Sequence, residues 1–307
     1  MKNKNPTVFV VAGMHRTGSS ALARGLLSLG VELGDNLLGP SESENPRGYW
    51  EDVDLIFLSD KVLAALGRRW ESVTPLLERD FSAAEYSDLV DEAATLITEK
   101  MAGSRFWGFK NPRTGPLIPF WRHVFQALDV QVKYLVTVRN PINVARSLTA
   151  RDHLSPGYSY ALWTSYYLDT LRNLKDEVSV FISYENLMTQ PEYELRRMAD
   201  VLDIPWDDGV ADSVRDYAKN FISDDLTHHH FDVPALKADI ANFSQTLNLY
   251  ELLGPLCEGT GSVLSPDLNI EIENISRSWR RQGRLLTIVV QQESGFEQRM
   301  AQHKSEI

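Results

Sequence analysis

The sequence predicts an α/β fold in which helices flank a mainly parallel sheet, and two observations indicate it. Short apolar runs, each ending at turn residues, alternate with longer segments in which apolar residues recur at helical spacing. The runs are residues 7–13, 105–110, 132–138 and 178–183. Because strands separated by helices are typical of parallel sheets, we expect a ligand to bind beyond the carboxyl ends of these strands.

The first run, TVFVVAG at residues 7–13, is apolar without alternation, which predicts a strand that is buried on both faces. Leu22, Leu26 and Leu29 then recur at helical spacing, and Gly30 supplies a stop signal. The order strand, glycine-containing loop and helix is therefore expected at the start of the chain.

The segment that follows, residues 33–50, is rich in Gly, Pro, Ser and Asn and is predicted to be a loop. Residues 51–67 and 83–102 have the patterns of amphipathic helices. Each of the three later strands is followed by turn residues and a helical pattern. Polar residues just after the strands are the first place to look for a site.

The chain after Pro266 has a different pattern, in which apolar residues fall on alternating three- and four-residue steps. These residues are Ile272, Ile275, Trp279, Leu286, Val289, Phe296 and Met300, and Gln282 and Glu293 occupy the two remaining positions of the pattern. Gly283 and Gly295 weaken the pattern, and LLTIVVQ fits a strand equally well. We divide the chain into a main domain at 1–262 and a mainly helical tail at 263–307 that could contact a partner or a second copy.

Composition limits the function. The 307 residues are 43% hydrophobic and 24% charged, as in ordinary globular proteins, and the formal net charge of −11 disfavours a nucleic-acid partner. The single cysteine, Cys257, has no internal disulfide partner and is expected to be a buried apolar residue. No apolar run approaches the ~20 residues of a membrane helix, and residues 1–6 are too short and polar for a signal peptide. We therefore expect a cytoplasmic protein without a membrane span.

The most informative loop is GMHRTGSSAL, in which Gly13 and Gly18 have the spacing of a phosphate-binding P-loop. Ser19 and Ser20 follow, where a nucleotide triphosphate site would have Lys and then Ser or Thr. The backbone N–H groups at the start of a helix bind an anion, and the hydroxyls of the serines and of Thr17 add donors. The missing lysine disfavours a triphosphate, and a glycine turn without ligand is the structural alternative.

Arg16 places a fixed positive charge inside this loop, where it suits a bridging oxygen that becomes negative as a leaving group departs. A second group of polar residues follows the strand at 132–138, with Arg139 at its end and Ser147 on the next helix. An arginine fork and a hydroxyl can converge on a second phosphate, although Arg139 alone fits a surface ion pair as well. Tyr184, after the strand at 178–183, offers an aromatic face to a base or a structural contact.

In this order, GMHRTGSSAL, VRNPINVARS and ISYENL resemble the sulfotransferases that use 3′-phosphoadenosine 5′-phosphosulfate (PAPS), over residues 6–235. The resemblance implies a P-loop-NTPase-like three-layer fold. It also implies that the 3′-phosphate is bound by Arg139 and Ser147, and that Tyr184 lies near adenine. The residues that it places around the 5′-phosphosulfate are Gly13, His15, Arg16, Thr17, Gly18, Ser19 and Ser20.

Two features depart from the family pattern. Ala21 stands where cytosolic relatives often have a tryptophan that stacks on adenine, and their later R-K-G loop is not evident. DDLTHHHF at 224–231 occupies its place, so His228, His229 and His230 are candidates for contacts to the 3′-phosphate or the acceptor. Consecutive histidines do not naturally converge on one ion, and we expect no metal.

The resemblance further implies in-line transfer of the sulfuryl group from PAPS to a hydroxyl, or less often an amine, leaving adenosine 3′,5′-bisphosphate. We expect Arg16 and Lys110 to stabilise charge and Glu51 to act as general base. In the alternative interpretation, Glu51 and Asp52 merely favour a helix N-terminus. Lower-ranked candidates for the base are His15 and His123, and the acceptor candidates are Arg47, Tyr49 and Arg113.

The acceptor is expected to be a glycan or a small metabolite, in a pocket shaped by residues 33–104 and 150–175. The aromatic run GYSYALWTSYYL at 157–168 would stack on a sugar or belong to the core. Two other functions compete with sulfotransfer. One is an ATP-dependent small-molecule kinase, which requires a Walker lysine and a Mg²⁺-organising acid, and the other is an inactive nucleotide-binding protein that assembles through its tail.

Overall fold

The computed structural model describes residues 6–42, 45–76, 78–81, 86–222, 244–259 and 264–281. Within these ranges the chain is an α/β protein with a parallel sheet in the order β2-β1-β3-β4, as the sequence predicts. The strands are β1 at Thr7–Val11, β2 at Phe106–Lys110, β3 at Gln131–Val138 and β4 at Ser179–Ser183.

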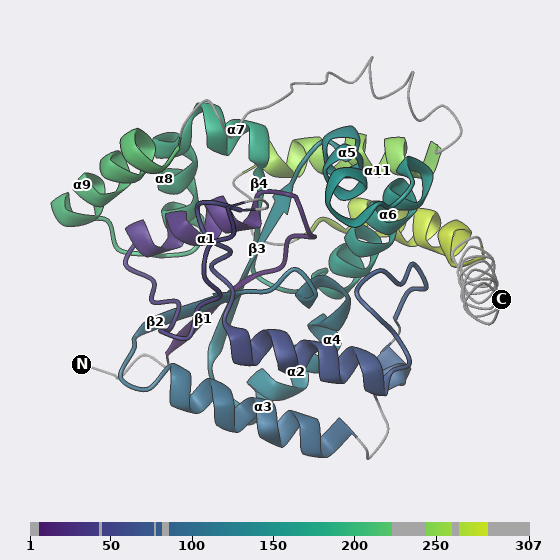
Figure 1. The fold of residues 1–307 in the computed structure, drawn as a ribbon, viewed down its shortest axis with the longest axis horizontal. Coiled ribbons are helices and arrows are strands. Elements are labelled where there is room, and N and C mark those ends of the chain that lie inside the picture. The colour runs from purple at the N-terminus through teal and green to yellow at the C-terminus, as the bar shows by residue number, and fades with distance from the viewer. Residues whose placement is uncertain are drawn as a thin grey trace, which may run out of the picture.

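The sheet separates two apolar cores, which makes the fold three-layered (Figure 1). Val8 and Val10 of β1 face one core, whereas Phe9 and Val11 face the other, so the whole strand is buried. The first core contains residues of α2 (Val53–Ala65), α3 (Ser87–Lys100), α4 (Thr114–Leu128), α6 (Pro156–Asn173) and α11 (Ser244–Glu258). The second contains residues of α1 (Ser19–Ser28), α7 (Tyr184–Thr189), α8 (Pro191–Val201) and α9 (Asp208–Asp216).

The carboxyl edge of the sheet is where the loops with polar residues gather. From β1 the chain passes to β2 on one side and then to β3 on the other, so the strand order reverses between β1 and β3. Such a reversal leaves a crevice at the carboxyl ends of the strands. Helices that start there begin with local signals: Asp52 caps α2, and Asn140 with Pro141 starts α5 (Pro141–Asp152).

The aromatic run on α6 belongs to the core, which decides between the two interpretations of its sequence. Tyr160, Trp163, Tyr166 and Tyr167 are at most 3% exposed. Cys257 on α11 is buried as predicted, and burial raises the pKa of its thiol. None of the helices in the ranges described is long and apolar enough to cross a membrane.

Residues 266–281 are helical, within the segment that we set apart as a tail. Ile272 and Trp279 are 2% and 3% exposed and lie in the core that α4 and α6 also form. The later part of the repeating pattern, from Leu286 to Met300, lies outside the described residues. We therefore propose that the first part of this segment packs as part of the main domain.

Candidate functional site

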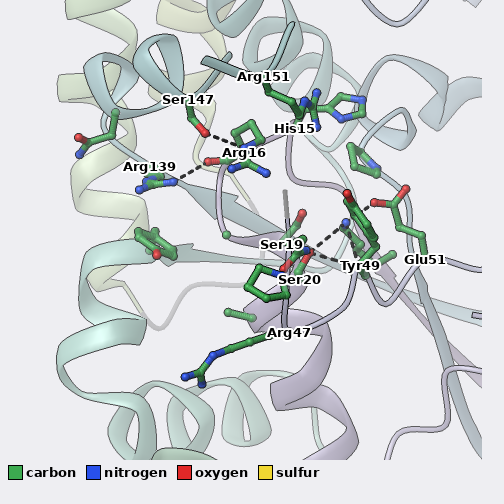
Figure 2. Close-up of a pocket in the computed structure, with 18 of the residues that line it drawn as sticks. His15, Arg16, Ser19, Ser20, Arg47, Tyr49, Glu51, Arg139, Ser147 and Arg151 are labelled. Carbon is green, nitrogen blue, oxygen red and sulfur yellow. Dashed lines mark hydrogen bonds and ion pairs between the residues drawn. The ribbon is translucent and has the colours of Figure 1, made fainter. Parts of the chain in front are cut away.

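A pocket of about 740 Å³ opens at the carboxyl edge of the sheet (Figure 2). Its walls come from the loop between β1 and α1, the segment 45–51, the end of β2, and α5 with the residues before it. Most of the candidate residues line it, although they come from segments far apart in the chain. Those residues are His15, Arg16, Gly18, Ser19, Ser20, Arg47, Tyr49, Glu51, Lys110, Arg139, Ser147 and Tyr184.

The glycine loop is held from below by β3. Thr17 is fully buried, and its hydroxyl donates to the Met14 carbonyl at 2.6 Å and lies 2.7 Å from the Thr137 hydroxyl. A side chain at Gly13 would collide with Thr137, since its Cβ would lie 1.9 Å from Oγ1. Gly13 and Thr17 therefore shape the loop and do not line the pocket. No pattern in the sequence predicts the contact of Thr137 with the loop.

Gly18 is required by the backbone and by Tyr184. Its φ of +88° is in the left-handed region, and an added Cβ would lie 2.1 Å from the Tyr184 ring. Arg16 also has a positive φ, 67°, which is uncommon for a residue with a side chain. The loop thus takes a backbone conformation that depends on its tertiary contacts.

Those contacts join the first motif to the second. Arg16 donates from Nε to the Ser147 hydroxyl at 2.6 Å, and Arg139 donates from Nη1 to the Arg16 carbonyl at 3.0 Å (Figure 2). The guanidinium of Arg139 lies 4.3 Å from the centre of the Tyr184 ring. Arg139 Nε is buried, and it has no hydrogen-bond partner in the part of the chain that the structure describes.

Lys110 and Glu51 form a buried ion pair in the pocket wall. Lys110 Nζ donates to Glu51 Oε1, to the Tyr49 carbonyl at 3.1 Å and to the Ser20 hydroxyl at 3.3 Å. Both side chains are less than 10% exposed. Burial lowers the pKa of Lys110, although the charge of Glu51 opposes this shift. In the chain, Glu51 precedes Asp52, and the side chain of Asp52 caps the N-terminus of α2.

Arg113, expected at the acceptor, is anchored away from the pocket. Its Nε donates to Asp60 Oδ1 at 2.6 Å, and its Nη1 is 3.9 Å from Glu51 Oε2. His123 is exposed on α4 and does not line the pocket. His228, His229 and His230 lie outside the described residues.

His15 lines the pocket beside Arg151 (Figure 2). It is 8% exposed and packs on Trp70, with ring centres 4.4 Å apart. Burial, and then the positive charges of Arg113 and Arg151, hold its pKa well below the ordinary 6.5, so the imidazole is neutral. Its Nε2 is buried without a hydrogen-bond partner among the described residues.

Several lining residues escaped the sequence analysis. Asn143, Arg146 and Arg151 share α5 with Ser147. Four-residue spacing from Ser147 could have identified Asn143 and Arg151. Phe221 ends a π-helical turn at Tyr217–Phe221. The guanidinium carbons of Arg24 and Arg47 lie 5.7 and 5.5 Å from its ring centre. A π-helical turn has no sequence signal of this kind, although it is frequent at functional sites.

No group of three or more His, Cys, Asp and Glu side chains is placed to hold a metal ion in the described ranges. Among the described lining residues, six are cationic and one is acidic. The cations are Arg16, Arg47, Lys110, Arg139, Arg146 and Arg151, and the acid is Glu51. The pocket therefore suits a ligand with several negative charges.

Comparison with known proteins identifies a family. Residues 6–208 match the family described as the sulfotransferase family. A sulfotransferase domain of the Synechococcus PCC 7002 olefin synthase is similar, with 23% identity and a TM-score of 0.43 over 82% of this chain and 95% of that one. A Mycobacterium avium sulfotransferase has 16% identity and a TM-score of 0.45 over 80% and 77%. No curated protein matches the sequence.

Proposed function

Since this chain belongs to the sulfotransferase family, we propose that it transfers the sulfuryl group of PAPS to a hydroxyl of a glycan or small metabolite. One observation carries the proposal. Hydrogen bonds join Arg16, which belongs to a phosphate-type loop without a Walker lysine, to Arg139 and Ser147 of the second motif. Such a group suits a nucleotide with a second phosphate and a transferable group.

The pocket fits such a donor in size and charge. Its volume of about 740 Å³ lies in the range of small-molecule sites. PAPS carries roughly four negative charges, of which the 3′-phosphate supplies about two, and six cationic side chains line the pocket. The buried Arg139 Nε lacks a hydrogen-bond partner in the described part of the protein, and a phosphate oxygen would supply one.

Each part of the donor then has a partner in the chain. The N–H groups of Gly18, Ser19 and Ser20 at the start of α1 would hold the 5′-phosphosulfate. Arg139 and Ser147 would bind the 3′-phosphate, and the ring of Tyr184 would contact adenine. Phe221 provides an aromatic surface in the same pocket, which Ala21 does not.

The reaction breaks the bond from sulfur to the bridging oxygen of the donor and forms a bond from sulfur to the acceptor oxygen. Arg16 would stabilise the charge that develops on the bridging oxygen, and Lys110 the charge on the sulfuryl oxygens. The acceptor hydroxyl would pass its proton to Glu51, which accepts a hydrogen bond from Lys110 in the pocket wall. The second product is adenosine 3′,5′-bisphosphate.

The two competing functions fit the site less well. A kinase would need an acid to organise Mg²⁺, but the one acid among the described lining residues, Glu51, is bonded to Lys110. An inactive nucleotide-binding partner would need the group formed by Arg16, Arg139 and Ser147, but it would not need the buried pair of Lys110 and Glu51 in the pocket wall. Sulfotransfer uses both the group and the pair.

Calorimetry tests the donor. We expect adenosine 3′,5′-bisphosphate to bind at least tenfold more tightly than 5′-AMP or ATP without Mg²⁺. Ser147→Ala and Arg139→Gln should weaken its binding about 10- to 100-fold, because each removes a contact to the 3′-phosphate. Binding of 5′-AMP, which has no 3′-phosphate, should weaken less, by the part of the effect that comes from loss of the contacts to Arg16. Equal affinity of the wild-type protein for all three nucleotides would contradict the proposal.

Turnover tests the base. With an acceptor found by screening with labelled PAPS, Glu51→Gln should lower kcat about 100-fold or more, since the acceptor proton has no base. Binding of adenosine 3′,5′-bisphosphate should stay within about threefold, and this control is needed because the variant leaves Lys110 without a carboxylate partner. Glu51→Asp should restore part of the rate. Near-wild-type kcat in Glu51→Gln would rule out Glu51 as the base.

A further inference from the structure

We propose that the acceptor carries an anionic oxygen group, a carboxylate or a sulfate or phosphate ester, and that Arg151 with His15 receives it. This inference rests on the proposed function, because it assigns the acceptor end of the same pocket. Arg151 takes the acceptor-binding role that the sequence analysis expected of Arg113. Arg113 is anchored on Asp60 and does not line the pocket.

The position of Arg151 on α5 separates it from the donor residues. Asn143, Ser147 and Arg151 follow one another at four-residue spacing, and all three line the pocket. Arg151 is therefore on the same helix face as Ser147 but one turn further along, about 6 Å away along the axis. Figure 2 shows Arg151 beside His15, with Ser147 between Arg151 and Arg139.

Most of the hydrogen-bond donors of the Arg151 guanidinium are not used within the described ranges. Its Nε donates to Asp152 Oδ2 at 2.8 Å, and its central carbon lies 5.6 Å from the centre of the Trp70 ring. Within the described ranges it has no other hydrogen bond or ion pair. Because a guanidinium has five N–H donors in a planar fork, the remaining donors can bind two oxygens of one anionic group.

His15 supplies a second polar contact at the same end. It packs on Trp70, the ring that Arg151 also approaches, so the two side chains share one aromatic support. Its buried Nε2 lacks a partner in the part of the chain that is described, and such a nitrogen is costly to leave unpaired. Being neutral, the imidazole can donate one hydrogen bond to an oxyanion without repelling Arg151.

The charges of the pocket favour an anionic acceptor over a neutral one. Arg16 and Arg139 are used by the proposed donor, and Glu51 balances Lys110. Arg151 lies close enough to lower the pKa of both His15 and Lys110, so its charge reaches the end of the pocket where the acceptor would bind. Asp152 pairs with Arg151 through Nε alone, so a neutral acceptor would leave the other guanidinium donors and the His15 nitrogen without an anionic partner.

The test uses three sugars that differ in one group: glucose, glucuronate and glucose 6-sulfate. Each is titrated calorimetrically into the full-length protein saturated with adenosine 3′,5′-bisphosphate. We expect at least one of the two anions to bind about tenfold or more tightly than glucose, as for one charge-assisted hydrogen-bonded pair. The tighter of the two identifies a carboxylate or an ester as the group. Arg151→Gln should remove this advantage and leave glucose binding unchanged.

Arg196→Gln is the matched control. Arg196 also lies over a tryptophan, with its guanidinium carbon 4.8 Å from the Trp206 ring centre, and pairs with Asp200, but it does not line the pocket. We expect the Arg196→Gln variant to bind all three sugars with the affinities of the wild-type protein. The inference is overturned if neither anion binds more tightly than glucose, or if Arg151→Gln keeps the advantage. Failure of adenosine 3′,5′-bisphosphate itself to bind would instead contradict the proposed function.

Discussion

At the scale of single residues, the site depends on side chains that hold a strained loop. Arg16 and Gly18 both have positive φ, and the contacts that hold them come from Arg139, Ser147 and Tyr184. For Arg16, which carries a side chain, this conformation is strained, and such strain persists only where the surroundings determine the conformation. The loop and the two later motifs are thus one structural unit.

Gly18→Ala tests that unit, and Gly30→Ala is its control. Both glycines have positive φ, +88° and +78°, but an added Cβ at Gly18 would collide with Tyr184, whereas at Gly30 nothing lies within 4 Å. We expect Gly18→Ala to lower the free energy of unfolding by about 2–4 kcal/mol, from backbone strain and overpacking. Gly30→Ala should cost about 1 kcal/mol.

Urea denaturation measures the free energy of unfolding of both variants, and calorimetry measures their affinity for adenosine 3′,5′-bisphosphate. The affinity should fall in Gly18→Ala and remain unchanged in Gly30→Ala. Equal losses of stability in the two variants would show that the contact with Tyr184 has no energetic importance.

At the scale of elements, α6 carries a buried carboxylate. Asp169 is 2% exposed, and its Oδ2 accepts a hydrogen bond from the Leu76 N–H at 3.3 Å. Oδ1 has no partner within the described ranges. Burial raises the pKa of Asp169 to about 7, against the effects of Arg172 and the Leu76 N–H. The helix therefore holds a protonated acid below neutral pH.

This group makes stability fall as the pH rises. Between about pH 4 and pH 7 the unfolded chain releases the Asp169 proton and the folded protein keeps it, which favours unfolding by up to about 4 kcal/mol across that window. Asp169→Asn cannot titrate and should be less sensitive to pH over the same range. Urea denaturation at pH 4.5, 5.5 and 6.5 measures the difference. Identical pH slopes in the two proteins would show that the carboxyl ionises normally.

At the scale of the whole molecule, two cores on opposite faces of one sheet support the site, and the helix at 266–281 contributes to one of them. The proposed contact surface of this segment is thus at least partly buried within the same chain. A partner that bound the segment would have to use its exposed residues, such as Ile270, which is 60% exposed.

Ile272→Ala and Ile270→Ala test whether the segment is part of the domain. Ile272 is 2% exposed, so its truncation should lower the free energy of unfolding by about 2–5 kcal/mol. Ile270→Ala removes the same atoms from the surface and should change it by less than about 0.5 kcal/mol. Denaturant unfolding of full-length protein measures both. Small and equal changes in the free energy of unfolding in the two variants would show that the segment at 266–281 is not part of the domain core.

The strands, the helices after them and the loops at the carboxyl edge could all be predicted, because glycine spacing, apolar runs and helix-capping residues are local signals. Arg16, Arg139, Ser147, Tyr184 and Glu51 lie just after those signals, and the structure brings them into one pocket. The pattern of the sequence therefore determined part of the set of residues that border the crevice, but not Arg146, Arg151 and Phe221.

Only the tertiary structure decided which side of each segment faces the pocket. Thr17 is turned onto Thr137, and Arg113 onto Asp60, whereas Arg151 reaches the site from the end of α5. Local sequence cannot predict this, because the direction of a loop side chain depends on the strand or helix packed against it. The order of the strands, which sets those neighbours, is a property of the whole fold.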